Sequence, residues 1–277
     1  MKLLRLLANI CLEETAGNLS AARPEVFVVI LELLQRLEGS EVGVNTCFDS
    51  NTGTFDEELV QYEELLLNCI SLATNLTYYA CRETGEDSGS KKHFVAVANS
   101  LSKFLFHEND DIVLEACRAL GNLTRSRCVL RAFSGSRVDD ALSLLLQHSN
   151  SDIVASVVGI YINATCSVDA DGIEKLFIIR DFNSLVETLT TVLRRLSLKS
   201  PDISSMICKV FHNVLSLSIK VPPALNQRLS DTLAELLDCA EDIACKNDCD
   251  ETTDCSITNR FQEFVSIGSV VSELLDY

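Results

Sequence analysis

Apolar residues recur along this chain at the three- and four-residue spacing of amphipathic helices. The pattern predicts long helices over residues 23–37, 93–107, 138–148, 182–196, 224–240 and 257–275, and brief ones over 127–133 and 172–179. Polar stretches separate them, above all residues 40–58, rich in Gly, Asn, Ser, Thr and acid, and residues 82–92. The sequence therefore predicts an all-α protein.

A short pattern recurs within further apolar helices: two residues, an asparagine, and then an aliphatic residue. The repeated asparagines stand 66, 47, 41 and 50 residues apart and are Asn9, Asn75, Asn122, Asn163 and Asn213. An acidic residue precedes all but the first by 11 residues, namely Glu64, Asp111, Asp152 and Asp202. Eleven residues make about three helical turns, so we expect each acid to cap a helix that ends near the asparagine. Repetition on this scale is typical of a solenoid.

The repeating unit is predicted to contain a short helix, a second helix and a long third helix, in about 41 residues where nothing is inserted. Two of the second helices end in His107 and His148, each four residues before the capping acid. A histidine in that position can interact with the last carbonyl groups of its helix, which predicts a structural role for both. Three Asn-x-Thr glycosylation signals coincide with repeated asparagines, and we interpret them as coincidental.

The net charge and the cysteine content exclude some classes of partner and environment. The chain has 23 basic and 40 acidic residues and a net charge of −17, which argues against nucleic acid and anionic membranes as partners. Most of the 12 cysteines lie singly in apolar runs, which predicts buried thiols in a reducing, cytoplasmic environment rather than disulfides. No window reaches the roughly 18 apolar residues of a membrane span.

Catalytic and metal-binding patterns are missing from the sequence. It contains no GxGxxG, P-loop, GxSxG or HExxH motif, and its four histidines are scattered. Near the C-terminus, Cys239, Cys245, Cys249 and Cys255 lack the CxxC spacing that places two thiolates on one zinc ion. We therefore predict no catalytic residue, no cofactor and no metal site.

The three-helix unit, with its acidic cap, apolar third helix and terminal asparagine, resembles the armadillo repeat, best of all over residues 127–166. The resemblance implies a right-handed α-solenoid of armadillo-type three-helix repeats. Residues 1–220 would form the repeats, with the loop 40–58 inserted, and residues 221–277 would form C-terminal capping helices around an acidic, cysteine-containing loop at 246–256. Residues 1–18 look like a third helix and its exit only, so the first repeat is predicted to be partial and to continue a longer array.

In the armadillo family the third helices line a concave groove, where the repeated asparagine holds the backbone of an extended peptide. The resemblance implies this role for the five repeated asparagines, since an amide offers both a donor and an acceptor. The alternative is that they satisfy neighbouring backbone groups.

One turn before the asparagines, three of the five positions are basic, namely Arg5, Arg118 and Lys209. Nuclear-import members of the family carry tryptophan there, and this chain has none, so a reader of basic signals is not expected. The basic positions suit an acidic or phosphorylated extended segment, unless they are merely solvated charges.

The sequence thus predicts a non-catalytic scaffold or adaptor for protein–protein interactions. Its cysteine-rich, degenerate repeats with long insertions resemble a ciliary and flagellar branch of the family linked to axoneme assembly, which would make axonemal or intraflagellar-transport components the partners. Two alternatives stay open: a catenin-like cytoplasmic adaptor, and an armadillo-type regulator of a small GTPase.

Overall fold

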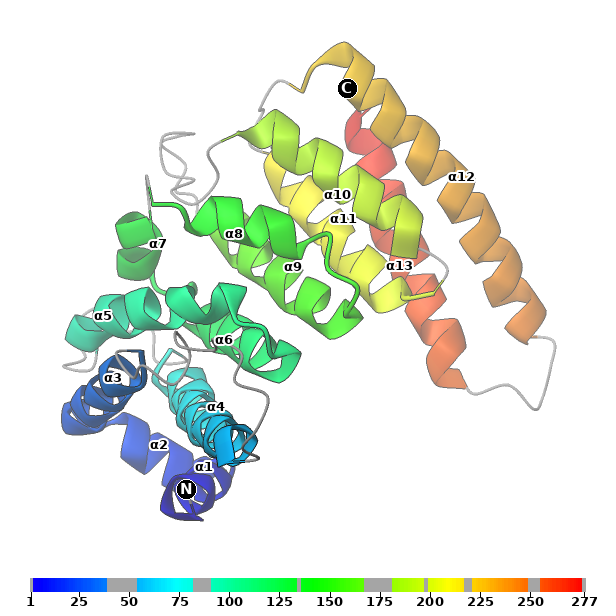
Figure 1. Ribbon diagram of the computed structural model, residues 1–277. Coiled ribbons are helices and arrows are strands. Elements are labelled where there is room, and N and C mark those ends of the chain that lie inside the picture. The colour runs from blue at the N-terminus through cyan, green and yellow to red at the C-terminus, as the bar shows by residue number, and fades with distance from the viewer. Residues whose placement is uncertain are drawn as a thin grey trace. The chain divides into compact units, whose positions relative to one another are not determined.

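The computed structural model describes residues 2–38, 54–81, 91–133, 136–166, 181–196, 199–216, 221–248 and 255–275. All regular structure within these ranges is helical (Figure 1), which confirms the all-α prediction. The chain forms two compact units, Met1–Ala132 and Phe133–Tyr277, called here the N-terminal and C-terminal units.

The repeated asparagines all lie on long apolar helices, called here the third helices. These are α1 (Lys2–Ile10), α4 (Thr54–Ala80), α6 (Asp110–Leu123), α9 (Ser151–Cys166) and α11 (Pro201–Ser216). Helix α6 shows how they pack, because Ile112, Ala116 and Leu120 recur at the helical spacing and are each at most 1% exposed.

Second helices precede most of the third helices, as predicted. They are α3 (Pro24–Glu38), α5 (Lys91–Leu101), α8 (Val138–Leu145) and α10 (Phe182–Leu196). Helix α5 continues as the 3₁₀ helix η2 (Ser102–Phe106), where one α-helix to residue 107 was expected. Helix α8 likewise ends three residues before the predicted residue 148.

Two short helices occupy the first position of a repeat. Helix α7 (Arg127–Phe133) has the predicted bounds, whereas α2 (Glu14–Ala21) was not predicted, because residues 1–18 were interpreted as a third helix and its exit. The exit is itself helical, with Glu13 Oε2 accepting a hydrogen bond from the Ala16 N–H at 2.7 Å as its cap. The predicted helix at 172–179 lies outside the described residues.

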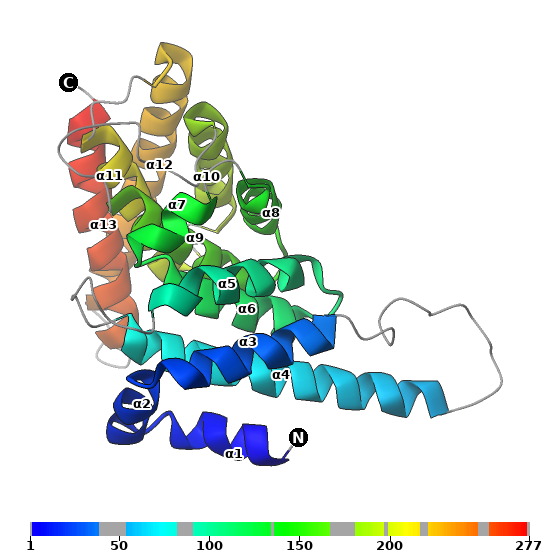
Figure 2. The same ribbon diagram turned by 90° about the vertical axis from the view of Figure 1, so that its left-hand side faces the viewer.

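In the N-terminal unit, third helices pack on third helices and second on second. Helix α4 lies between α1 and α6, while α3 packs on α5 (Figure 2). An edge-to-face contact between Phe27 and Phe94, with ring centroids 5.5 Å apart, joins α3 to α5. Helix α2 approaches α4 closely, since a Cβ on Gly17 would lie 2.1 Å from the ring of Tyr79.

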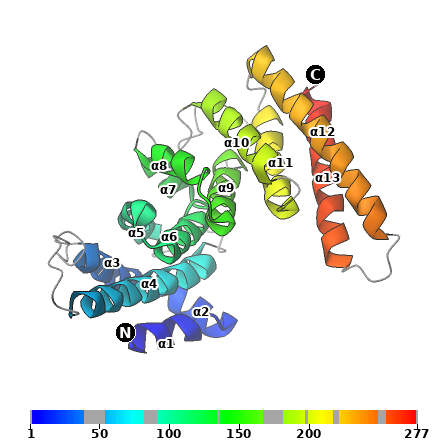
Figure 3. The same cartoon turned by 45° about the vertical axis from the view of Figure 1, so that its right-hand side comes forward.

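The C-terminal unit repeats this arrangement. Helix α11 packs on both α9 and α10, and the two last helices extend the stack: α12 (Pro223–Asp248) packs on α10, and α13 (Cys255–Leu275) packs on α11 and α12 (Figure 3). These two helices thus take the positions of a further second and third helix, and they cover the apolar face that α10 and α11 would otherwise expose.

The helix caps differ from the prediction. Asn109 Oδ1 accepts from the Asp111 N–H and Asn150 Oδ1 accepts from the Asp152 N–H, both at 2.9 Å, so the asparagines are the cap residues. Asp111 and Asp152 are second residues of their helices, where a carboxylate still meets the positive end of the dipole. Asp202 has the same position in α11, and Glu64 lies inside α4.

The two histidines belong to the same turns. His107 Nδ1 accepts a hydrogen bond from the Asn109 N–H and His148 Nδ1 from the Asn150 N–H, both at 3.0 Å. Both contacts are with the backbone of the next cap, which the sequence analysis did not predict. An Nδ1 that accepts requires an imidazole with its proton on Nε2.

Two predicted loops are shorter than expected. Helix α4 begins at Thr54, within the stretch 40–58, because the acidic residues that end this stretch form its first turns. Helices α12 and α13 likewise extend into 246–256 from both sides. Residues 39–53 and 249–254 lie outside the described residues.

Candidate partner-binding face of the third helices

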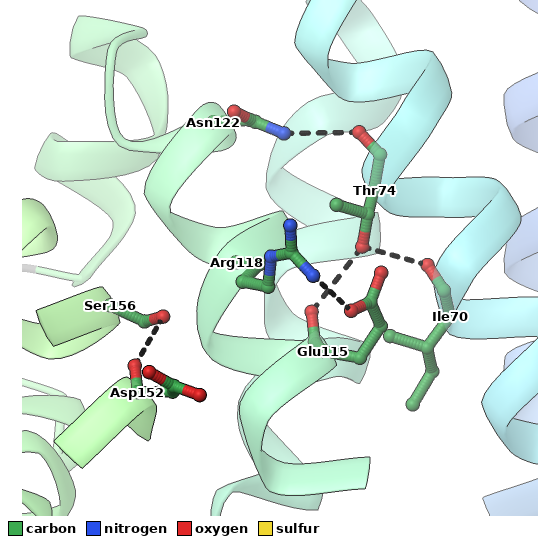
Figure 4. A network of polar contacts seen from close by, with 7 residues as sticks. All are labelled: Ile70, Thr74, Glu115, Arg118, Asn122, Asp152 and Ser156. Carbon is green, nitrogen blue, oxygen red and sulfur yellow. Dashed lines mark hydrogen bonds and ion pairs between the residues drawn. The ribbon is translucent and has the colours of Figure 1, made fainter. Parts of the chain in front are cut away.

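The repeated asparagines link one third helix to the preceding one. Asn75 donates from Nδ2 to the carbonyl oxygen of Ala8 at 2.8 Å. Asn122 donates from Nδ2 to the carbonyl oxygen of Thr74 at 3.0 Å, the bond drawn in Figure 4. Ala8 and Thr74 each stand one residue before the repeated asparagine of their own helix. The same bond at the same position in two successive repeats makes a hydrogen-bonded ladder across α1, α4 and α6.

Threonines two residues after the repeated asparagine complete the ladder. Asn122 Nδ2 also lies 3.4 Å from Thr77 Oγ1, and Asn213 Nδ2 donates to Thr165 Oγ1 at 3.0 Å. Both threonines are buried and donate their own hydroxyl proton to a carbonyl oxygen of the same helix, which leaves the oxygen lone pairs to accept. The Asn-x-Thr pattern is thereby explained as part of the link between repeats.

The ladder uses only part of each amide. A side-chain amide has two N–H groups and a carbonyl oxygen with two lone pairs. Among the described residues, Asn75, Asn122 and Asn213 make no other side-chain hydrogen bond, and all three are partly exposed. One N–H therefore fixes the orientation of the amide, while the other N–H and the oxygen stay available.

The remaining two repeated asparagines have different surroundings. Asn163 is partly exposed on α9. Asn9 is exposed on α1, and its amide makes no hydrogen bond with any residue that the structure describes. The structure therefore brings Asn9, Asn75 and Asn122 to one face of the N-terminal unit, and Asn163 and Asn213 to one face of the C-terminal unit.

The three basic positions are exposed, and two have acidic neighbours. Arg118 Nη1 lies 3.3 Å from Glu115 Oε2 on the same helix, and Lys209 Nζ lies 2.9 Å from Glu263 Oε1 on α13. Arg5 has no ion pair within the described part of the chain. The pair of Lys209 and Glu263, in which both side chains are exposed, contributes about 0–1 kcal/mol, so a carboxylate or phosphate of a ligand can replace Glu263 at little cost.

Sequence reasoning missed two residues on the same face. Tyr78 stands three residues after Asn75, about one turn further along α4, and Arg125 stands three residues after Asn122, in the turn that follows the end of α6 at Leu123. Both are exposed, and the ring of Tyr78 lies edge-on to that of Tyr79 with centroids 5.1 Å apart. The three-residue offset from the repeated asparagines was the signal that could have found them.

Thr74 adds a second contact between α4 and α6. Its hydroxyl donates to the carbonyl oxygen of Ile70 at 3.0 Å and lies 3.3 Å from that of Glu115 (Figure 4). The same picture shows Ser156 of the C-terminal unit donating to the carbonyl oxygen of Asp152 at 2.8 Å, a bond within α9.

The described ranges contain neither a metal-binding cluster nor a membrane-spanning helix. No group of three or more His, Cys, Asp or Glu side chains in the described part of the chain could hold a metal ion. Cys239 and Cys245 are exposed on α12, while the side chains of Cys249 and Cys255 lie outside the description. No helix in the described ranges is both long and apolar enough to cross a membrane.

Comparison with known proteins supports the repeat assignment, although no family model matches the chain. Armadillo repeat-containing protein 2 of Mus musculus is 27% identical over 237 residues, 86% of this chain and 24% of that protein. The Homo sapiens protein of the same name is 27% identical over 213 residues, 77% of this chain and 21% of its own length. The chain is built of armadillo-type repeats. It spans about a quarter of the length of these relatives.

A solved structure gives the same result for the fold alone. The crystal structure of an engineered protein from the Northeast Structural Genomics Consortium superposes on the armadillo-type repeats with a TM-score of 0.51 and 14% sequence identity. The superposition covers 96% of this chain and 98% of that one. The predicted fold class and the armadillo resemblance are thereby confirmed, whereas the contact of the asparagines with a ligand stays a prediction.

Proposed function

We propose that the chain is a non-catalytic scaffold that holds an extended segment of a partner protein along its third helices. The ladder is the observation that carries the proposal. In Asn75, Asn122 and Asn213 one N–H is held by the preceding third helix, and the rest of the amide lies on a partly exposed face. A pre-oriented amide binds peptide backbone with less loss of rotamer entropy and without regard to sequence.

Side chains around the amides would select the segment. Arg5 and Arg118 stand one turn before Asn9 and Asn122 and favour acidic or phosphorylated residues, while the exposed ring of Tyr78 offers an apolar contact. The guanidinium of Arg118 is already oriented by Glu115, which a stronger anion would displace.

Peptide selection tests this proposal without a known partner. A displayed library of unstructured 12-residue peptides is selected on the full chain, and the selected peptides are measured by fluorescence anisotropy. We expect Asn122→Ala to weaken them at least about fivefold, since a hydrogen bond to a ligand backbone is worth about 1 kcal/mol.

Asn226→Ala is the matched control, because it removes a similar bond between helices, from Asn226 Nδ2 to the carbonyl oxygen of Leu275 at 3.1 Å. Equal affinities of all three proteins, or equal losses in both variants, would refute binding by the ladder. Hydrogen exchange in the presence of bound peptide gives a second readout. Protection confined to the second helices would also refute binding by the ladder.

We further propose cilia and flagella as the place of action, with axonemal or intraflagellar-transport components as partners. This part is supported by the sequence resemblance alone, and it is tested by the location of a tagged copy in ciliated cells. A tag at cell junctions would favour the catenin-like adaptor instead. Faster nucleotide release from a small GTPase on addition of the chain would favour the regulator.

A further inference from the structure

Helix α1 has an apolar face that no described residue covers. Leu3, Leu6, Leu7 and Ile10 are 68%, 55%, 38% and 45% exposed. The opposite side of α1 packs on α4 and buries Ala8 to 5% exposure. In Figures 1, 2 and 3, α1 lies at the edge of the N-terminal unit with α4 beside it.

The same face is buried in every other third helix. Counted from the repeated asparagine, the four exposed residues stand at −6, −3, −2 and +1. Their equivalents in α4 are Cys69, Leu72, Ala73 and Leu76, and no equivalent in α4, α6, α9 or α11 is more than 5% exposed. A surface that is buried at four places and open at one is an interface of the repeat without its partner.

The direction of this face identifies what belongs on it. At about 100° per residue, the four positions fall in one stripe about 100° wide, on the side away from the residue that precedes the asparagine. The residue before the asparagine faces the next third helix: in α1 this residue is Ala8, whose carbonyl oxygen accepts the hydrogen bond from the Asn75 amide of α4. The open stripe of α1 therefore faces the side on which a preceding third helix would lie.

Asn9 points to the same occupant. In the ladder, each asparagine donates to a backbone carbonyl of the third helix before it, at 2.8 Å for Asn75 and 3.0 Å for Asn122. Asn9 is exposed, and its amide has no such acceptor among the described residues. An aliphatic stripe and an unused amide at the ladder position thus require one and the same partner.

We propose that Leu3, Leu6, Leu7, Asn9 and Ile10 dock the third helix of another armadillo-type repeat, parallel to α1 and with a backbone carbonyl presented to the Asn9 amide. The interface would continue the one between α1 and α4. A second copy of α1, related by a twofold axis, fits less well because it would set the open stripe against itself, whereas the Ala8 side, which accepts in the ladder, already packs on α4. The docking surface contains no charged residue, so the partner helix is expected to be aliphatic along the contact.

Site-specific cross-linking tests the proposal in the intact protein. The photoreactive residue p-benzoyl-phenylalanine replaces Leu6 in the chain expressed in its own cells, and the irradiated products are identified by mass spectrometry. We expect the cross-linked peptide to come from the third helix of an armadillo-type repeat. The mass of the product, one chain or two, shows whether that repeat belongs to the same polypeptide.

Two variants sharpen the result. Leu3→Glu places a charge on the exposed face, where it leaves the fold intact but lowers the cross-linking yield at least fivefold. The same photoreactive residue at Leu144, which is 62% exposed on α8, should give no armadillo-type product. No cross-link at position 6, a cross-link to α1 of a second copy, or one to a protein without such repeats would overturn the proposal. None of these outcomes affects peptide binding by Asn122, which lies on α6.

Discussion

The bond from Asn122 to Thr74 is expected to stabilise the N-terminal unit by about 1 kcal/mol, the net contribution of a typical intramolecular hydrogen bond. Its length of 3.0 Å is normal for N–H···O, and the amide is only partly exposed. The carbonyl oxygen of Thr74 also accepts from the Thr77 hydroxyl at 3.0 Å, so Asn122→Ala leaves no buried acceptor without a donor. The loss should therefore stay close to that mean.

Alanine is a better helix former than asparagine by about 0.6 kcal/mol, so this gain offsets part of the stability that Asn122→Ala loses with the hydrogen bond. Asn68→Ala supplies the reference, because Asn68 also lies in a third helix of the same unit, and the one acceptor of its Nδ2 among the described residues is the carbonyl oxygen of Glu64 in the same helix, at 2.6 Å. Both substitutions gain the same helix propensity. The difference between them should be at least about 0.5 kcal/mol in the free energy of unfolding.

Urea unfolding followed by far-ultraviolet circular dichroism measures the difference, and hydrogen exchange shows whether it is confined to α4 and α6. A variant at Asn122 that is as stable as the one at Asn68, or more stable, would refute the view that the ladder holds neighbouring repeats together. Equal protection of α4 and α6 in both variants would lead to the same conclusion.

Three further predictions concern caps and buried groups. Asn150→Ala should lower the free energy of unfolding by about 1 kcal/mol and Asp152→Ala by only a few tenths, because Asn150 is the cap of α9. Thermal unfolding distinguishes the two variants. Tyr161→Phe should lower the free energy of unfolding by about 1–2 kcal/mol, because the Tyr161 hydroxyl donates to Asp139 Oδ1 at 2.9 Å. Burial and the Asp139 carboxylate raise the pKa of Tyr161, so the hydroxyl keeps its proton and urea titrations should give the same loss from pH 6 to pH 9. Burial raises the pKa of three thiols to about 12, those of Cys69, Cys117 and Cys208. These thiols should resist a thiol reagent at pH 8, while exposed cysteines react. The stability that the three neutral thiols contribute should fall as the pH rises from 9 to 12.

Local patterns were enough to predict most helices. Helix α10 has the predicted bounds because Asp181 precedes it and accepts from the Asn183 and Ser184 N–H groups as a cap, while its apolar residues keep the helical spacing. The cap of α6 could not be predicted, since Asn109, Asp110 and Asp111 are all suitable cap residues in sequence. Backbone geometry decides among them, with Asn109 in the extended region at φ −88° and ψ 115°.

The candidate site was predictable only in part, because its contacts join residues far apart in sequence. Spacing located the repeated asparagines, but it left open whether the amides bind neighbouring backbone or a ligand. The structure shows the bond from Asn75 to Ala8, across 67 residues, and the ligand contact remains to be tested. The pair of Lys209 with Glu263 likewise depends on α13 packing against α11, which no local pattern encodes.

The net charge of −17 constrains how an acidic segment could bind. Much of the acid lies away from the third helices, for example on one exposed side of α12, where Asp231, Glu235, Asp238 and Asp242 recur at helical spacing. Such charges repel an acidic ligand at long range, and salt screens them beyond about 10 Å at 0.1 M.

Contacts with Arg118 act only once the ligand has arrived. The association rate of an acidic peptide should therefore rise as salt increases from about 0.01 to 0.15 M, and its dissociation rate should rise too, because charge–charge contacts weaken. Stopped-flow fluorescence separates the two rates. If the association rate of the acidic peptide falls with salt instead, the face of the third helices attracts anions at long range, which would contradict this distribution of charge.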